Sequence, residues 1–180
     1  NPETDPYIVQ KYNAKNFRKE KAKNKKALQD ELGLPVDEKK FMIGIVSRLT
    51  DQKGLDLIQC VMDELCSEDL QLVVLGTGDE RYENMFRHYD WKYHDRVSAQ
   101  IYYSEPLSHK IYAACDAFLM PSLFEPCGLS QLMSLRYGTV PIVRETGGLK
   151  DTVIPYNEYT KEGTGFSFAN YNAHEMLATI

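Results

Sequence analysis

The sequence predicts an α/β fold in which a parallel sheet carries helices on both of its faces. The length of 180 residues fits one domain. Apolar β-type runs alternate with stretches of helical spacing, and the connections between them are short. This alternation favours parallel strands joined by crossover helices. We therefore expect residues 18–180 to form one domain, preceded by a linker or edge segment over residues 1–17, which show no clear periodicity.

The first elements follow from chain breakers and apolar spacing. A basic helix is expected over about residues 18–32, because Gly33 suits the position after a helix and Pro35 prevents its continuation. The apolar run Phe41–Val46 is typical of a buried strand. An amphipathic helix follows, with apolar residues at helical spacing; these are Leu55, Ile58, Met62 and Leu65.

The later elements are predicted in the same way. The run Leu70–Leu75 is a second apolar strand. The remaining expected elements are a helix over about 79–90, a strand over 97–101, a helix containing Leu107, Ile111 and Ala114, a strand over 117–120 that Pro121 stops, a helix over 128–137 that ends at Gly138, a strand over 140–143, a short strand over 163–168 and a helix from about Asn172.

The basic residues are concentrated in one stretch of an acidic chain. The net charge is −5, but residues 11–26 hold eight Lys or Arg and one acid, which leaves a balance of −12 for the rest. A solvated helix face is the ordinary interpretation. The alternative interpretation is a surface that binds an anionic polymer or a glucan. The acidic remainder of the chain would repel nucleic acid, which disfavours that partner. We expect no nucleic-acid partner.

The cysteine and histidine pattern argues against a metal centre. Four cysteines stand apart in mostly apolar contexts, with no C-x-x-C pair and no zinc-finger spacing; they are Cys60, Cys66, Cys115 and Cys127. Lone thiols are typical of a reducing cytoplasm. No apolar run approaches the ~18 residues of a membrane span. A cytoplasmic protein without a membrane partner is expected.

Ligands of parallel sheets bind beyond the carboxyl ends of the strands. In the first such loop, Arg48 and Lys53 lie five residues apart before a helix, which suits a diphosphate clamp but also ordinary surface cations. In the second, Gly76-Thr77-Gly78 permits close backbone approach but lacks a dinucleotide fingerprint, and Asp79 is a possible helix cap.

Two further loops combine polar groups with bare backbone. Glu125 stands ahead of a helix start at Cys127–Leu129, where free amides and a carboxylate could bind a ligand or only cap the helix. Glu145–Asp151 contains Gly147 and Gly148, which bring amides toward a phosphate or form an ordinary turn. No D-x-D is present, so the loops rather than a metal would meet the charge of a diphosphate.

Five blocks in order carry a resemblance to a known family. They are S-R-L-x-x-Q-K-G (47–54), Y-x-E-x-L-S-H (103–109), P-S-x-F-E-P-C-G-L-x-Q-L (121–132), Y-G-T-x-P-I-V-R-x-T-G-G-L-x-D-T-V (137–153) and G-T-G-F-S-F (163–168). Together they resemble bacterial glycogen synthase and plant starch synthase. The resemblance implies the Rossmann-like C-terminal half of a GT-B glycosyltransferase, with residues 1–17 coming from the crossing out of the N-terminal half.

The resemblance also implies a reaction, the retaining transfer of glucose from ADP-glucose to the 4-OH end of an α-1,4-glucan acceptor, without a metal or other cofactor. It makes Arg48, Lys53 and Glu125 catalytic. Tyr103 would stack on the adenine, and the remaining implied donor contacts are Cys127, Gly128, Leu129, Thr146, Gly147 and Gly148.

One position departs from the broader group of related enzymes. Many retaining GT-B enzymes carry a second Glu eight residues after the first, where this chain has Met133. The glycogen and starch synthase branch tolerates this, but what binds the donor ribose is left open. The family also places its acceptor site and a K-x-G-G-L loop in the N-terminal half, so we expect that missing half as a partner of this domain. The alternative is a UDP-sugar-binding module of another GT-B enzyme, inactive in isolation.

Overall fold

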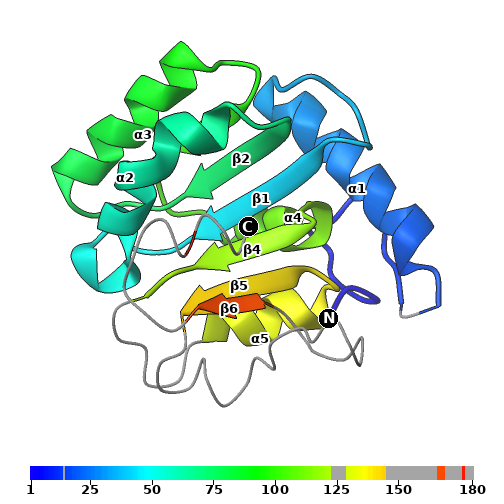
Figure 1. The fold of residues 1–180 in the computed structure, drawn as a ribbon. Coiled ribbons are helices and arrows are strands. Elements are labelled where there is room, and N and C mark those ends of the chain that lie inside the picture. Colours follow the sequence, from blue (N-terminus) through cyan, green and yellow to red (C-terminus); the bar gives the residue numbers. More distant parts are fainter. Residues whose placement is uncertain (14, 123–128, 145–165, 169–175, 177–180) are drawn as a thin grey trace, which may run out of the picture.

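A computed structural model of the chain describes residues 1–13, 15–122, 129–144, 166–168 and 176. Within these residues, a single parallel sheet has the strand order β3-β2-β1-β4-β5-β6 (Figure 1). The strands are β1 Phe41–Val46, β2 Leu70–Leu75, β3 Val97–Gln100, β4 Ala117–Met120, β5 Val140–Arg144 and β6 Phe166–Phe168. The order reverses between β1 and β4, which is the switch point where such sheets bind ligands.

Helices cover both faces of the sheet, as the sequence predicts. They are α1 Phe17–Leu32, the 3-10 turn η1 Asp51–Lys53, α2 Leu55–Cys66, α3 Glu80–Lys92, α4 Glu105–Ala114 and α5 Leu129–Arg136. Helices α2 and α3 lie together on one face, and α1 and α4 lie together on the other (Figure 1). The strands are therefore enclosed by helices, which explains their continuous apolar sequences.

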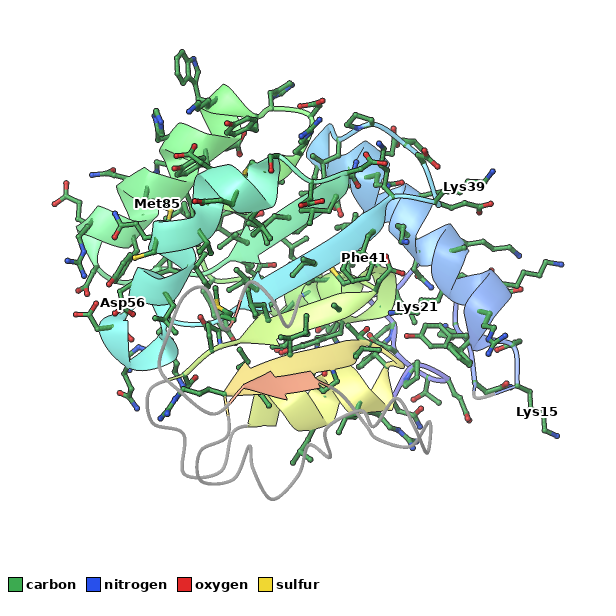
Figure 2. All side chains as sticks on the ribbon, in the orientation of Figure 1. Lys15, Lys21, Lys39, Phe41, Asp56 and Met85 are labelled. Atoms are coloured by element: carbon green, nitrogen blue, oxygen red, sulfur yellow. The ribbon has the colours of Figure 1, made fainter. Side chains whose placement is uncertain are left out.

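The side chains of each central strand alternate between the two faces. Ile43 and Ile45 of β1 pack with α2 and α3, whereas Met42 packs with Leu28 of α1 and with α4. Figure 2 shows side chains filling the space between sheet and helices. At Gly44, an added Cβ would lie 2.7 Å from Ile111 Cγ2, so this glycine lets α4 approach the sheet closely.

The basic helix α1 corrects the prediction of a simply solvated charged face. Lys21 and Lys25 are buried. Lys21 Nζ donates to Tyr112 O at 2.9 Å and Ala113 O at 2.8 Å, at the end of α4, and to Thr139 Oγ1 at 2.7 Å, just before β5. Lys25 Nζ pairs with Asp116 at 2.6 Å. The long stems of lysines are apolar, and the Lys21 amino group meets two of the last carbonyls of α4, which have no partner within the helix.

The segment before α1 is packed against the domain. Ile8 and Tyr12 are buried beside Tyr112 and Tyr137 in one core cluster. The Tyr12 hydroxyl donates to Tyr137 O at 2.5 Å. Residues 1–13 are therefore packed into the same core as α4. Whether residues 1–17 belong to a separate half of a larger protein stays a prediction.

Most predicted elements coincide with observed ones within one or two residues. The strand over 163–168 is seen as β6, and residues 163–165 lie outside the described residues, as does the region from Asn172 except Met176, which is buried in the core. Cys60, Cys66 and Cys115 are free thiols, and burial raises the pKa of Cys66 to about 11. No helix in the described ranges is long and apolar enough to cross a bilayer.

Candidate functional site

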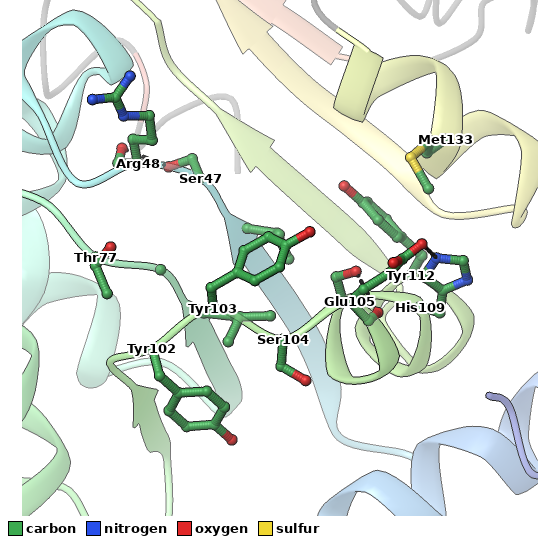
Figure 3. Close-up of a pocket in the computed structure, with 14 residues that line it drawn as sticks. Ser47, Arg48, Thr77, Tyr102, Tyr103, Ser104, Glu105, His109, Tyr112 and Met133 are labelled. Carbon is green, nitrogen blue, oxygen red and sulfur yellow. Dashed lines mark hydrogen bonds and ion pairs between the residues drawn. The ribbon is translucent and has the colours of Figure 1, made fainter.

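A pocket of about 450 Å³ opens at the carboxyl edge of the sheet, beside its switch point. The loop after β1 contributes Ser47 and Arg48, and the loop after β2 contributes Gly76 and Thr77. The far wall comes from the segment after β3 and from two helices (Figure 3); its residues include Tyr102, Tyr103, Ser104, Glu105, His109 and Tyr112, with Met133 from α5. The pocket thus lies where the topology predicts a ligand site.

The loops after β1 and β2 hold each other by backbone hydrogen bonds. Leu49 N donates to Thr77 O, and Asp79 N donates to Leu49 O, each at 2.9 Å. A Cβ at Gly76 would lie 1.9 Å from Ser47 O, and one at Gly78 would lie 2.4 Å from Leu49 O. Gly76 and Gly78 therefore allow the loop after β1 to pack closely against the loop after β2. Their close packing fixes the backbone that carries Arg48.

The turn that carries Lys53 contacts the end of β4. Gly54 follows with φ of +79°, and a Cβ there would lie 2.1 Å from Pro121 O. Lys53 is not among the residues that line the pocket, whereas Arg48 is. The two predicted clamp cations therefore lie on one edge of the sheet but differ in place: Arg48 faces the pocket, and Lys53 belongs to the turn beside β4.

The carboxyl ends of β4 and β5 lie at this same edge. Arg144 Nε, at the end of β5, donates to Ser122 O after β4 at 3.0 Å. The loops that follow these strands carry predicted residues that lie outside the described ones, namely Glu125, Cys127, Gly128, Thr146, Gly147 and Gly148. Leu129 is the first residue of α5. The ends of β4 and β5, where these loops begin, thus lie at the edge that holds Arg48.

Tyr103 is 87% exposed within this pocket. Figure 3 shows its ring between Arg48 on one side and Glu105 and His109 on the other. A large aromatic ring exposed in a concave site offers a face on which a flat heterocycle can stack. The ring of Tyr103 is therefore suitably placed for the predicted stacking role.

Glu105 and His109 received no role from the sequence, although both lie in the quoted block 103–109. His109 Nδ1 lies 2.6 Å from Asp5 Oδ2, and its Nε2 lies 3.7 Å from Glu105 Oε1. Burial alone would raise the pKa of Asp5, but hydrogen bonds from Tyr137, the Tyr7 amide and His109 hold it below its usual value. The sequence signal that could have identified them is their position in the first turns of a helix that follows a strand, at the ligand edge of the sheet.

Metal ligands are not assembled in the part of the chain that the structure describes. No group of three or more His, Cys, Asp or Glu side chains there could hold a metal ion. The expectation that no metal is needed stays a prediction. Within the described residues, the cationic group that faces the pocket is the Arg48 guanidinium.

Comparison with known proteins gives consistent results. The family model described as "Glycosyl transferases group 1" matches residues 25–180. The chain is 81% identical over its whole length to glycogen synthase of Lachnospira eligens, and it is 76% identical to that of Lachnoclostridium phytofermentans. It spans 38% of the length of each of these relatives.

A solved structure gives the same answer for the fold. The catalytic domain of starch synthase IV from Arabidopsis thaliana, bound to ADP and acarbose, superposes with a TM-score of 0.91 at 37% identity. The match covers 99% of this chain and 38% of that one. The resemblance to glycogen and starch synthases and the Rossmann-like half of a GT-B fold are therefore confirmed. The chain belongs to the group 1 glycosyltransferases.

Proposed function

We propose that this chain is the donor-binding domain of a glycogen synthase, which transfers glucose from ADP-glucose to the 4-OH end of an α-1,4-glucan with retention. The observation that carries the proposal is a pocket that combines Arg48 with the exposed ring of Tyr103. This pocket lies in a chain 81% identical to one named glycogen synthase. The related starch synthase structure holds ADP and acarbose.

The chemistry of the proposed reaction explains the cation. When the bond between glucose and the diphosphate breaks, negative charge develops on the departing ADP. Arg48 and Lys53 stabilise that charge, and loop amides at Thr146, Gly147 and Gly148 add donors to the phosphates. Removing one such preorganised donor typically lowers turnover by about 100- to 1000-fold. The proposal requires no metal ion, because the fixed cations and the hydrogen-bonding amides stabilise the negative charge on the departing ADP.

The donor sugar is assigned to the loop between β4 and α5. Glu125 contacts the donor glucose as the catalytic carboxylate, and the backbone of Cys127, Gly128 and Leu129 lies close to the same sugar. Tyr103 stacks on the adenine, which uses the face of the base and not its hydrogen-bonding edge. These roles rest on the resemblance.

The remaining parts of the proposal concern the whole protein. The chain spans 38% of the length of its relatives. The resemblance assigns the glucan acceptor site to the N-terminal half, and the lone thiols suit an active protein in the cytoplasm. A second candidate function, a UDP-sugar-binding module of another GT-B enzyme, is the competing assignment.

The test is a transfer assay with the complete protein, a glucan primer and either ADP-glucose or UDP-glucose. We expect incorporation of glucose from ADP-glucose and its loss in Glu125→Ala. Glu64→Ala, which removes an exposed carboxylate from α2, is the matched control and should retain activity. Wild-type turnover in Glu125→Ala would refute the catalytic role. A clear preference for UDP-glucose would support the competing assignment.

A further inference from the structure

We propose that Glu105 binds the ribose 2′- and 3′-hydroxyls of the nucleotide, and that Asp5 positions it through His109. This inference rests on the proposed function, because it requires a nucleoside diphosphate in the pocket. It goes beyond that function by assigning ribose recognition to two pocket residues and to a segment more than ninety positions earlier in the sequence.

The pocket has one cationic and one anionic side. Among the described residues that line it, Arg48 is the only Lys or Arg and Glu105 is the only carboxylate. The two lie on opposite sides of the Tyr103 ring (Figure 3). A diphosphate is attracted to the guanidinium and repelled by the carboxylate. A nucleotide whose base stacks on Tyr103 and whose phosphates turn toward Arg48 places its ribose beside the ring. The ribose hydroxyls are neutral, so unlike the phosphates they suit Glu105.

Glu105 is the best acceptor on its side of the pocket. Its side chain is 61% exposed. It is not needed to cap α4, because the Ser104 hydroxyl accepts from Leu107 N at 3.2 Å. The nearby Ser108 hydroxyl already donates to Glu105 O at 2.7 Å. Met133 offers only a thioether, which is a weak acceptor, whereas a carboxylate has two oxygens for two adjacent hydroxyls.

His109 connects this carboxylate to the buried N-terminal segment. It lies one helical turn after Glu105, with Nε2 at 3.7 Å from Glu105 Oε1. Its Nδ1 lies 2.6 Å from Asp5 Oδ2, so both ring nitrogens face carboxylate oxygens. The Tyr7 ring packs edge-on against the imidazole at 5.1 Å. The ring is therefore fixed, with Nε2 directed toward Glu105.

Asp5 is itself held in place. It is buried, its Oδ1 accepts from Tyr7 N at 2.9 Å, and its Oδ2 also accepts from the Tyr137 hydroxyl. A carboxylate with this many donors has one orientation. It holds the His109 ring, and the ring nitrogen Nε2 then lies at ion-pair distance from the Glu105 carboxylate, 3.7 Å. Such outer contacts orient the groups of a binding site. Asp5 and His109 are positioning residues, and Glu105 is the residue that contacts the ligand.

The experiment compares ADP with 2′,3′-dideoxy-ADP by calorimetry on the complete protein. We expect the wild type to bind ADP about tenfold more tightly or better, as for hydrogen bonds to a charged group. Glu105→Gln removes the charged acceptor and the repulsion of the diphosphate, so it should weaken ADP relative to the dideoxy nucleotide, and the ratio of the two affinities should fall. Glu64→Gln on α2 is the matched control and should keep the wild-type ratio.

Asp5→Asn and His109→Gln test the positioning. Both should lower the ADP to dideoxy-ADP ratio while leaving dideoxy-ADP affinity intact, whereas a merely structural role would lower both affinities equally. An equal loss for the two nucleotides, or an unchanged ratio in Glu105→Gln, would overturn the inference. Failure of the wild type to bind ADP would instead overturn the proposed function. ADP binding without any preference over dideoxy-ADP would overturn this inference alone.

Discussion

At the scale of single residues, Tyr103 combines high exposure with a place inside a concave pocket. A ring that buries so little surface contributes little to folding, so its substitution reports on binding. Stacking of a base on an aromatic ring is worth about 1–3 kcal/mol. Tyr103→Ala should therefore raise the KM for ADP-glucose by about tenfold with a smaller change in kcat.

Tyr103→Phe is the matched control for this prediction, because it keeps the ring and removes only the hydroxyl. Steady-state kinetics of the complete protein should give a near-wild-type KM for this variant. A loss in Tyr103→Phe as large as that in Tyr103→Ala would show that the hydroxyl matters, and it would contradict stacking as the role of this residue.

At the scale of elements, the turn between β1 and α2 depends on Gly54. Gly33 and Gly54 have nearly the same backbone, with φ of +73° and +79°. An added Cβ meets nothing within 4 Å at Gly33 but lies 2.1 Å from Pro121 O at Gly54. Gly33→Ala should cost about 1 kcal/mol for the left-handed conformation alone.

Gly54→Ala should cost about 2–4 kcal/mol, since displacement of Pro121 is added to the same backbone penalty. It should also reduce transfer activity more than Gly33→Ala, because it moves the turn that carries Lys53. Thermal unfolding and the transfer assay check both effects. Equal stability and equal activity of the two variants would contradict the contact between this turn and β4.

The docking of α1 on α4 gives a prediction about pH. Desolvation lowers the pKa of Lys21 to about 7, against 10.5 for an unperturbed lysine. Between these values the unfolded chain binds more protons than the folded one, so stability rises with pH there. The free energy of unfolding of the wild type should increase from pH 7 to pH 9 by up to about 1.4 kcal/mol per pH unit.

Lys21→Met removes this dependence together with three hydrogen bonds. At pH 7 it should destabilise the domain by about 2–3 kcal/mol, because it leaves buried acceptors without their donor. Denaturant unfolding at several pH values measures both effects. A variant whose stability rises from pH 7 to pH 9 as steeply as that of the wild type would show that Lys21 is not the group responsible.

At the scale of the whole molecule, the sheet and its helices were predictable because their cause is local. Phe41–Val46 is apolar throughout, and Gly33 has no side chain, so periodicity and backbone freedom place β1 and the end of α1. The burial of Lys21 was not predictable, because its acceptors lie more than ninety residues away. A lysine-rich helix has the same sequence pattern with or without such acceptors.

The candidate site likewise has a part that the sequence predicted and a part that it did not. The position of Arg48 two residues after a strand predicted its place at the carboxyl edge of the sheet, and Arg48 lines the pocket there. The arrangement of Asp5, His109 and Glu105 was not foreseen, because Asp5 and His109 are 104 residues apart and only tertiary packing joins them. Sequence order thus predicts the edge of the sheet, and packing decides which side chains meet there.

The central claim is that the Arg48 side of the pocket binds a diphosphate, and calorimetry with ADP and adenosine tests it most directly. The complete wild-type protein should bind ADP at least about tenfold more tightly than adenosine, as for charge-assisted hydrogen bonds to phosphate. Arg48→Ala should erase most of that difference. Arg87→Ala, which removes a guanidinium paired with Glu83 on α3, should not. An unchanged preference for ADP over adenosine in Arg48→Ala would contradict the account.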